Sequence, residues 1–127
     1  MSSALKTILV VDDEPVLRTI VREILLEEGY AVIEAADGAG GVASALEHEP
    51  DAVLLDLMMP GDPDGIGALA RIREALPDVP VIMMSAAVPA HGLDPTIAGF
   101  MAKPFDLTQL VELVARLIGH PHANGCA

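Results

Sequence analysis

The sequence predicts one α/β domain built on a doubly wound sheet of five parallel strands with helices on both faces. Five short apolar runs alternate along the chain with segments in which apolar residues recur at helical spacing. This alternation is typical of βαβ units with right-handed crossovers. The runs are mostly continuous, as in strands buried on both faces. Of the 127 residues, 52% are hydrophobic but only 2% aromatic, so the predicted core is aliphatic.

The five predicted strands are short aliphatic runs bounded by turn residues or charges. They are residues 7–11, 31–35, 52–55, 80–84 and 99–102. Asp12, Asp56, Ser85 and Lys103 each follow one of these runs directly. Polar or charged side chains therefore mark four of the five strand ends.

The first predicted helix is the best defined, because its start and its end both carry a recognisable residue. Pro15 is placed as the first helical residue, with Asp13 or Glu14 as the cap before it. Gly29 closes the helix.

Three further helices are predicted from apolar spacing. A weaker one follows Asp37, a third spans residues 66–76, and the last covers residues 107–118 with Asp106 as its cap. We expect a single domain over residues 1–127, with its core at about 6–118 and a flexible tail at 119–127, acting without an attached output domain.

Charge and cysteine usage limit the possible partners and compartments. The net charge is −12, from 19 acidic and 7 basic residues. No basic stripe is available for direct nucleic-acid binding, and an anionic membrane surface is also disfavoured. The only cysteine, Cys126, predicts no disulfide within the chain and favours a cytoplasmic protein. The sequence shows no signal peptide and no run of membrane-spanning length.

The acidic strand ends predict a site for phosphate chemistry. In an open parallel sheet, ligands bind beyond the carboxyl ends of the strands, where Asp12, Asp13, Asp56 and Lys103 should meet. Crowded carboxylates repel one another, and a hard divalent cation, Mg²⁺ first, would relieve that repulsion. A lysine adds a point charge suited to a phosphoryl oxygen.

Four stretches, each at a predicted strand end, resemble the receiver domain of bacterial two-component response regulators, the class of the chemotaxis regulator. They are residues 8–15 (ILVVDDEP), 53–60 (VLLDLMMP), 84–86 (MSA) and 103–105 (KPF). Each stretch alone is weak evidence, but the four together, in this order, are specific. The resemblance covers about residues 6–118 and implies the flavodoxin-like strand order 2-1-3-4-5.

The resemblance implies that Asp56 is a phosphoacceptor rather than part of a conventional enzyme. It would take a phosphoryl group from a sensor histidine kinase or a histidine phosphotransfer protein, forming an aspartyl phosphate. Asp12, Asp13, Asp56 and the backbone carbonyl of Met58 would hold Mg²⁺. Lys103 would pair with Asp56 before transfer and with the phosphoryl group after it.

The same resemblance implies a conformational switch. Ser85 would move to hydrogen-bond the phosphoryl group, and Phe100 would turn inward with it. The changed surface would then bind a downstream protein or a second copy of the chain. The Lys103–Pro104 bond would be cis, as it usually is in the family.

Two departures from the family pattern affect these expectations. The loop after Asp56 is one residue longer than usual, with Asp62 and Pro63 inserted. The stretch between Ser85 and Lys103 is short and rich in proline and glycine, which predicts a shortened or irregular fourth helix. Only residues 94–98 could form a turn or two.

Two other interpretations remain beside this one, and a third is discounted. Asp12 and Asp13 could merely cap a helix. The domain could be a pseudo-receiver, a constitutive protein-interaction module; the irregular fourth-helix region favours this mildly, whereas the complete set of acidic residues and lysine argues against it. A flavodoxin-like electron carrier is discounted, because it would need a hydroxyl- and glycine-rich phosphate loop and aromatic side chains to stack the flavin.

Overall fold

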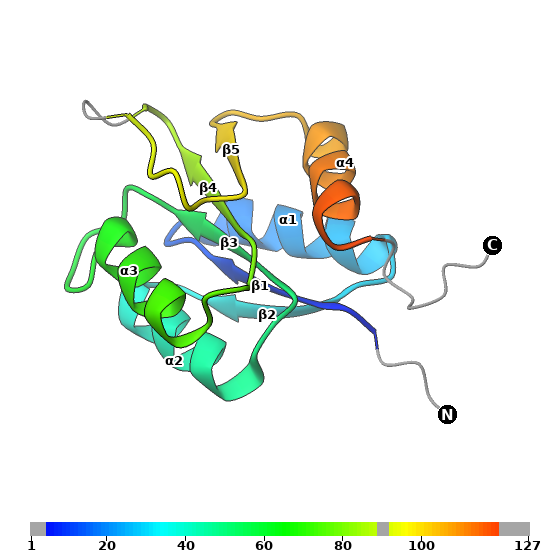
Figure 1. The fold of residues 1–127 in the computed structure, drawn as a ribbon. Coiled ribbons are helices and arrows are strands. Elements are labelled where there is room, and N and C mark those ends of the chain that lie inside the picture. The colour runs from blue at the N-terminus through cyan, green and yellow to red at the C-terminus, as the bar shows by residue number, and fades with distance from the viewer. Residues whose placement is uncertain (1–4, 89–91, 120–127) are drawn as a thin grey trace.

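The computed structural model describes residues 5–88 and 92–119. Strands and helices alternate through these ranges, and the strands form one parallel sheet in the order β2-β1-β3-β4-β5 (Figure 1). The elements are β1 (Thr7–Val11), α1 (Pro15–Glu27), β2 (Ala31–Ala35), α2 (Gly38–His48), β3 (Ala52–Asp56), α3 (Gly65–Ala75), β4 (Val81–Ser85), β5 (Gly99–Ala102) and α4 (Leu107–Ile118). The predicted fold class and strand order are confirmed, and the strand bounds agree to within one residue: Asp56 and Ser85 are the last residues of β3 and β4 and do not follow them.

Side chains alternate across the sheet and feed two separate cores. On β1, Ile8 and Val10 point toward α1 and α4, whereas Leu9 and Val11 point toward α2 and α3. Figure 1 shows the two helix pairs on opposite faces of the sheet. Since all four of these β1 residues are fully buried, the strand is covered on both faces, as the continuous apolar run predicted.

Aspartates start three of the four helices. The Asp37 carboxylate accepts a hydrogen bond from the Gly40 N–H at 2.7 Å, and Asp64 and Asp106 cap α3 and α4 in the same way. The first helix differs, because its N-cap residue, Glu14, makes no side-chain capping bond. Its carboxylate instead accepts a hydrogen bond from Lys103.

The connection from β4 to β5 is irregular. The described parts of it, residues 86–88 and 92–98, contain no helix. A single turn is present, in which the Ile97 N–H donates to the Asp94 carbonyl at 3.2 Å. The predicted irregularity is therefore confirmed, and the turn or two of helix allowed for residues 94–98 is reduced to this one turn. The connection is the yellow segment beside β4 and β5 in Figure 1.

The structure describes little of the predicted C-terminal tail and can be compared with the prediction on membrane spans. Apart from Gly119, the predicted tail at 119–127, with Cys126, lies outside the described residues. Within the described ranges, no helix combines the length and the apolar character needed to cross a bilayer.

Candidate phosphoryl-transfer site

Asp12 and Asp56 lie next to each other at the carboxyl edge of the sheet. Val11 of β1 pairs with Leu55 of β3. The next residues along the two strands, Asp12 and Asp56, are therefore neighbours. Both aspartates are buried, with 0% and 3% of their surface exposed. Two buried carboxylates destabilise a fold unless a cation is close to them.

Lys103 supplies that cation from the end of β5, at the same edge of the sheet. It follows β5, and its backbone N–H donates to the Ser85 carbonyl at 2.8 Å. Its Nζ atom lies 3.0 Å from Asp12 Oδ2 and 3.1 Å from Asp56 Oδ2. It also lies 2.7 Å from Glu14 Oε1, so one ammonium group serves three carboxylates.

The pKa shifts reflect this imbalance. Burial raises the pKa of the Asp12 carboxyl, and the charge on Asp56 adds to the increase; hydrogen bonds from the Glu14 N–H and from Lys103 oppose it. For Lys103, burial alone would lower the pKa, but hydrogen bonds to Glu14, Asp12 and Asp56 outweigh burial and raise it. The lysine therefore stays charged, and the site retains an excess of negative charge.

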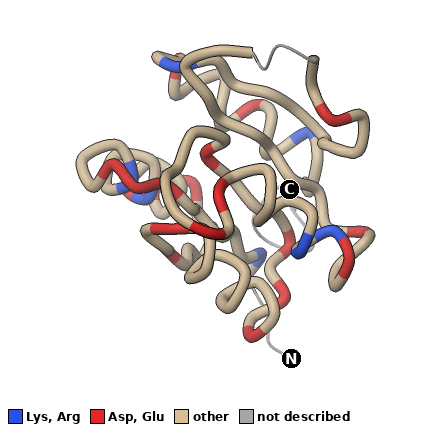
Figure 2. The backbone as a smooth tube through the Cα atoms, turned by 90° about the vertical axis from the view of Figure 1, so that its left-hand side faces the viewer, with Lys and Arg blue, Asp and Glu red and all other residues tan. Residues whose placement is uncertain are grey.

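The acidic cluster fits a hard divalent cation. One carboxylate oxygen from each of Asp12, Asp13 and Asp56 lies within 4.8 Å of the other two. Asp13 is exposed, so one side of the cluster is open to water. Oxygen ligands with room for several waters are what Mg²⁺ requires. Basic positions are few across the fold (Figure 2), and only Lys103 contacts these carboxylates among the described residues.

The loop after β3 is tightly bound to the rest of the site. The Met58 N–H donates to Asp56 Oδ1 at 3.0 Å, which orients the Asp56 carboxylate. The Leu57 N–H donates to the Met84 carbonyl at 2.8 Å. A Cβ atom at Gly65 would lie 2.5 Å from the Asp56 carbonyl oxygen, so only glycine allows α3 to start this close.

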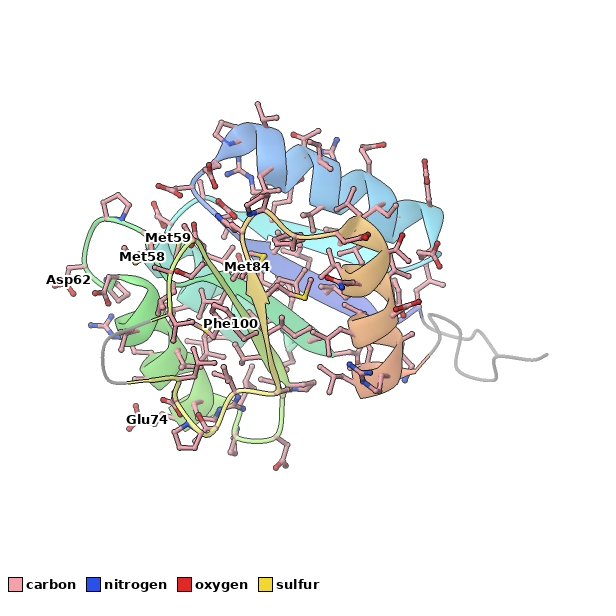
Figure 3. The ribbon with its side chains drawn as sticks, turned by 90° about the horizontal axis from the view of Figure 1, so that it is seen from above. Met58, Met59, Asp62, Glu74, Met84 and Phe100 are labelled. Carbon is pink, nitrogen blue, oxygen red and sulfur yellow. The ribbon has the colours of Figure 1, made fainter. Side chains whose placement is uncertain are left out.

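The side chains of Met58 and Met59, both labelled in Figure 3, lie in different environments. The side chain of Met58 is 64% exposed beside Asp56, whereas Met59 is buried among the α2 and α3 side chains. The role of the Met58 carbonyl as a metal ligand stays a prediction.

Ser85 lies at the same edge but is bonded to its own turn. Its Oγ atom donates to the Ala87 carbonyl at 2.8 Å and accepts from the Ala87 N–H at 3.2 Å. The residue is fully buried. To reach a phosphoryl group on Asp56, the hydroxyl would have to exchange its bond to the Ala87 carbonyl.

Phe100 is one strand further along the sheet. It pairs with Met83 in the β4–β5 ladder and packs, partly buried, against the core on the α2 and α3 side. Its predicted switch role stays a prediction.

Comparison with known proteins identifies the family. The family model for the response regulator receiver domain matches residues 8–115. This chain belongs to that family. It is therefore a receiver domain of two-component response regulators, a signalling family rather than a conventional enzyme family.

Solved receiver structures share both the fold and a substantial part of the sequence. The receiver domain of sensor histidine kinase PA1611 from Pseudomonas aeruginosa has 34% identity and a TM-score of 0.82, and the alignment covers 91% of this chain and 99% of that one. That structure holds a magnesium ion in its active-site cleft. TrrA from Thermotoga maritima, solved with Mg²⁺ and BeF, has 32% identity and a TM-score of 0.79, covering 89% and 99%.

Among curated relatives, the transcriptional regulatory protein KdpE of Mycobacterium tuberculosis is 40% identical over 124 residues. The alignment covers 94% of this chain but 53% of that protein. The receiver thus spans about half the length of the curated relatives it matches first.

The receiver site contains one acidic residue that sequence reasoning considered only as a helix cap. Glu14 makes the shortest of the three contacts with Lys103, although its own side chain is 58% exposed. Its position after Asp12 and Asp13, at the edge where Lys103 was expected, is the signal that could have indicated the contact.

A depression of about 870 Å³ opens over the receiver site. Asp13, Glu14, Asp56 and Lys103 line it on the polar side. Its apolar wall comes from the first turns of α1, the β5–α4 loop and the first residue of α4. The residues are Val16, Leu17, Ile20, Pro104, Phe105 and Leu107. The Asp56 carboxylate is thus reached through a partly apolar surface.

Proposed function

We propose that this receiver accepts a phosphoryl group on Asp56 from a phosphohistidine of a sensor histidine kinase or a histidine phosphotransfer protein. The observation that supports this most strongly is the environment of Asp56. It is a buried carboxylate whose Oδ1 is oriented by the Met58 N–H and whose Oδ2 contacts the ammonium of Lys103. A pseudo-receiver would have no need for this arrangement.

In the transfer step, an Asp56 carboxylate oxygen forms a bond to phosphorus as the bond from phosphorus to the imidazole nitrogen breaks. The imidazole leaves with the electron pair of that bond. Lys103 moves from the Asp56 oxygen to an oxygen of the incoming group and neutralises part of its charge. Bound Mg²⁺, held by Asp12, Asp13 and Asp56 and by the Met58 carbonyl, would supply further neutralisation of charge.

The apolar wall of the depression supports docking of a protein donor. Val16 is 73% exposed and Ile20 is 43% exposed, and both line the depression that contains Asp56. Exposed aliphatic side chains beside a buried acceptor are typical of a protein interface, where water is excluded on docking. The donor residue would be presented above Asp56 while the partner covers α1.

Ser85 and Phe100 would transmit the change. The phosphoryl group offers the Ser85 hydroxyl a charged acceptor in place of the Ala87 carbonyl. Movement of the Ser85 turn would then shift β4 against β5, where Phe100 pairs with Met83. The population shift would alter the surface available to a downstream protein or a second copy of the chain. A cytoplasmic location, predicted from the single cysteine, is part of this proposal.

The test is intact-mass measurement after incubation with acetyl phosphate and Mg²⁺. Wild type should gain one hydroxylamine-labile phosphoryl group, and Asp56→Asn should gain none, because an amide is a poor nucleophile. Asp78→Asn is the matched control, since Asp78 is an exposed aspartate in the α3–β4 loop.

An unmodified wild type at saturating acetyl phosphate and Mg²⁺ would instead favour the pseudo-receiver. Equal labelling of Asp56→Asn and wild type would mean that another residue is the acceptor.

A further inference from the structure

Parallel sheets usually have helices on both faces, but the described residues of the β4–β5 connection form none. Beside the irregular β4–β5 connection there is a groove of about 300 Å³, here called the α3 groove. Its apolar lining comes from the β3–α3 loop, α3, β4 and the connection itself: Leu57, Ile66, Leu69, Met83, Leu93 and Ile97. Ile66 and Leu93 are 56% and 39% exposed, so the groove presents apolar surface to its surroundings.

The wall opposite α3 is held in place by hydrogen bonds. The Arg73 guanidinium on α3 donates to the Thr96 carbonyl of the connection at 3.0 Å and to the Val79 carbonyl at 2.6 Å. The Asp94 carboxylate accepts from the N–H and the hydroxyl of Thr96, at 2.7 and 2.6 Å. The groove is therefore formed before any partner arrives, which lowers the entropy lost on binding.

The charged residue that lines the groove is acidic, and two more aspartates lie in the loop before Ile66. Asp94 lines the groove, and the two hydrogen bonds from Thr96 lower the pKa of its carboxyl, so it is ionised. Asp62 and Asp64 lie in the loop that leads to Ile66, and Figure 3 shows Asp62 at the outer side of that loop. Arg73 is the nearby cation: its guanidinium donates to backbone carbonyls and its charge also lowers the pKa of Asp94, but the three aspartates outnumber it. A complementary ligand would place positive charge at this rim.

We propose that the α3 groove binds a short basic amphipathic helix of a partner protein. Two or three apolar side chains at i, i+3 and i+7 would fill the groove, as in helix-in-groove recognition. Lysine or arginine beside them would face Asp94 and the Asp62–Asp64 loop. The partner helix would cover the sheet where the chain's own crossover provides none.

Charge argues against a second copy as the occupant. Two chains of net charge −12 would bring acidic rims together, which opposes association. A small molecule is also disfavoured, because about 300 Å³ is at the lower limit of ligand pockets. The proposal concerns a partner-binding surface of the receiver but does not require a phosphoryl group on Asp56.

The test is an NMR titration of the unphosphorylated full chain. The probe is a synthetic amphipathic peptide of about 15 residues, long enough to form a helix when bound, with leucines on one face and lysines beside them. We expect saturable shifts centred on Ile66, Leu69, Leu93 and Ile97, and an affinity that falls as salt is raised. A peptide with glutamate in place of lysine should bind at least roughly tenfold more weakly.

The variants Ile66→Ser and Leu93→Ser should each weaken binding roughly fivefold or more, because both remove apolar contact. Leu46→Ser is the matched control: Leu46 is 51% exposed on α2 and does not line the groove. Shifts centred on the Asp56 edge, equal loss in all three variants, or concentration-dependent shifts at Ile66 and Leu93 without peptide would each overturn the proposal. None of these results depends on whether Asp56 accepts phosphate.

Discussion

Two regions of the molecule differ in the hydrogen bonds that fix them. One is the sheet edge where β1 and β3 end, and the other is the connection that follows β4. At the first, short loops are bonded backbone to backbone and carboxylate to backbone, as with the Met58 N–H on Asp56. At the second, Ser85 holds Ala87 and the Ala98 N–H bonds the Val81 carbonyl at the two ends, whereas the segment around Thr96 is held by the Arg73 side chain and an aspartate-centred turn. The proposed transfer to Asp56 requires fixed positions in the first region, whereas the second can be irregular without moving the Asp56 carboxylate.

The largest effect should come from removing the cation at the fixed edge. Lys103→Met leaves the buried Asp12 and Asp56 carboxylates without their ammonium, and breaking a buried ion pair costs about 3–5 kcal/mol. Chemical denaturation without Mg²⁺ should show this loss.

The loss in Lys103→Met should depend on pH and on Mg²⁺. The pKa of Asp12 is already raised, and protonation removes the repulsion, so the variant should lose more stability at pH 8 than at pH 5. Added Mg²⁺ should restore stability to the variant more than to wild type, because it binds the same carboxylates. A loss independent of both pH and Mg²⁺ would contradict this account of the edge.

A pair of glycine substitutions compares the site edge with β5, the strand that follows the connection. At Gly65 a Cβ atom would meet the backbone carbonyls of Asp56 and Leu57, which cannot move without moving the site. Gly65→Ala should therefore cost about 1–3 kcal/mol and reduce phosphorylation by acetyl phosphate.

At Gly99, on β5, the Cβ atom would meet a methyl group of Leu113 at 3.0 Å, and that side chain can rotate away. Gly99→Ala should change stability by less than about 0.5 kcal/mol. Similar losses in the two alanine variants, measured by urea unfolding, would mean that the site edge is no more constrained than the start of β5.

A smaller effect is expected at Arg73. Arg73→Lys keeps the charge but cannot maintain all the bonds to the Pro77, Val79 and Thr96 carbonyls, and should cost about 1 kcal/mol. Amide exchange should accelerate at Thr96 and Ile97 but not at Met58. The control is Arg71→Lys, on the exposed side of α3. Unchanged exchange at Thr96 would show that Arg73 does not anchor the connection.

The smallest change in stability is expected from Glu14→Gln, because an exposed partner contributes less than about 0.5 kcal/mol. Its effect should be on function: with one carboxylate fewer competing for Lys103, the affinity for beryllofluoride should rise about twofold or more. Equal affinities for wild type and variant would mean that Glu14 does not compete with the phosphoryl group.

The fold could be predicted because its signals are local. Aliphatic runs such as residues 52–55 and capping aspartates such as Asp37 specify strands and helices within a few residues of themselves. The convergence of Asp12, Asp56 and Lys103 was also predictable, since parallel strands end at a common edge. The prolines and glycine near residues 89–95 likewise predicted the irregular crossover.

The sequence by itself determined the fold class, the strand order implied by the family resemblance and the set of acidic and basic residues at the sheet edge. Only the tertiary structure decided how charge is shared within that set: that Glu14 reaches Lys103, that Asp13 faces solvent while Asp12 is buried, and that Ser85 bonds its own turn. It also placed Ile66 and Leu93 on either side of one groove. Strand and helix signals act over a few residues, whereas burial and side-chain contacts depend on segments as far apart as Glu14 and Lys103, which only the packed sheet brings together.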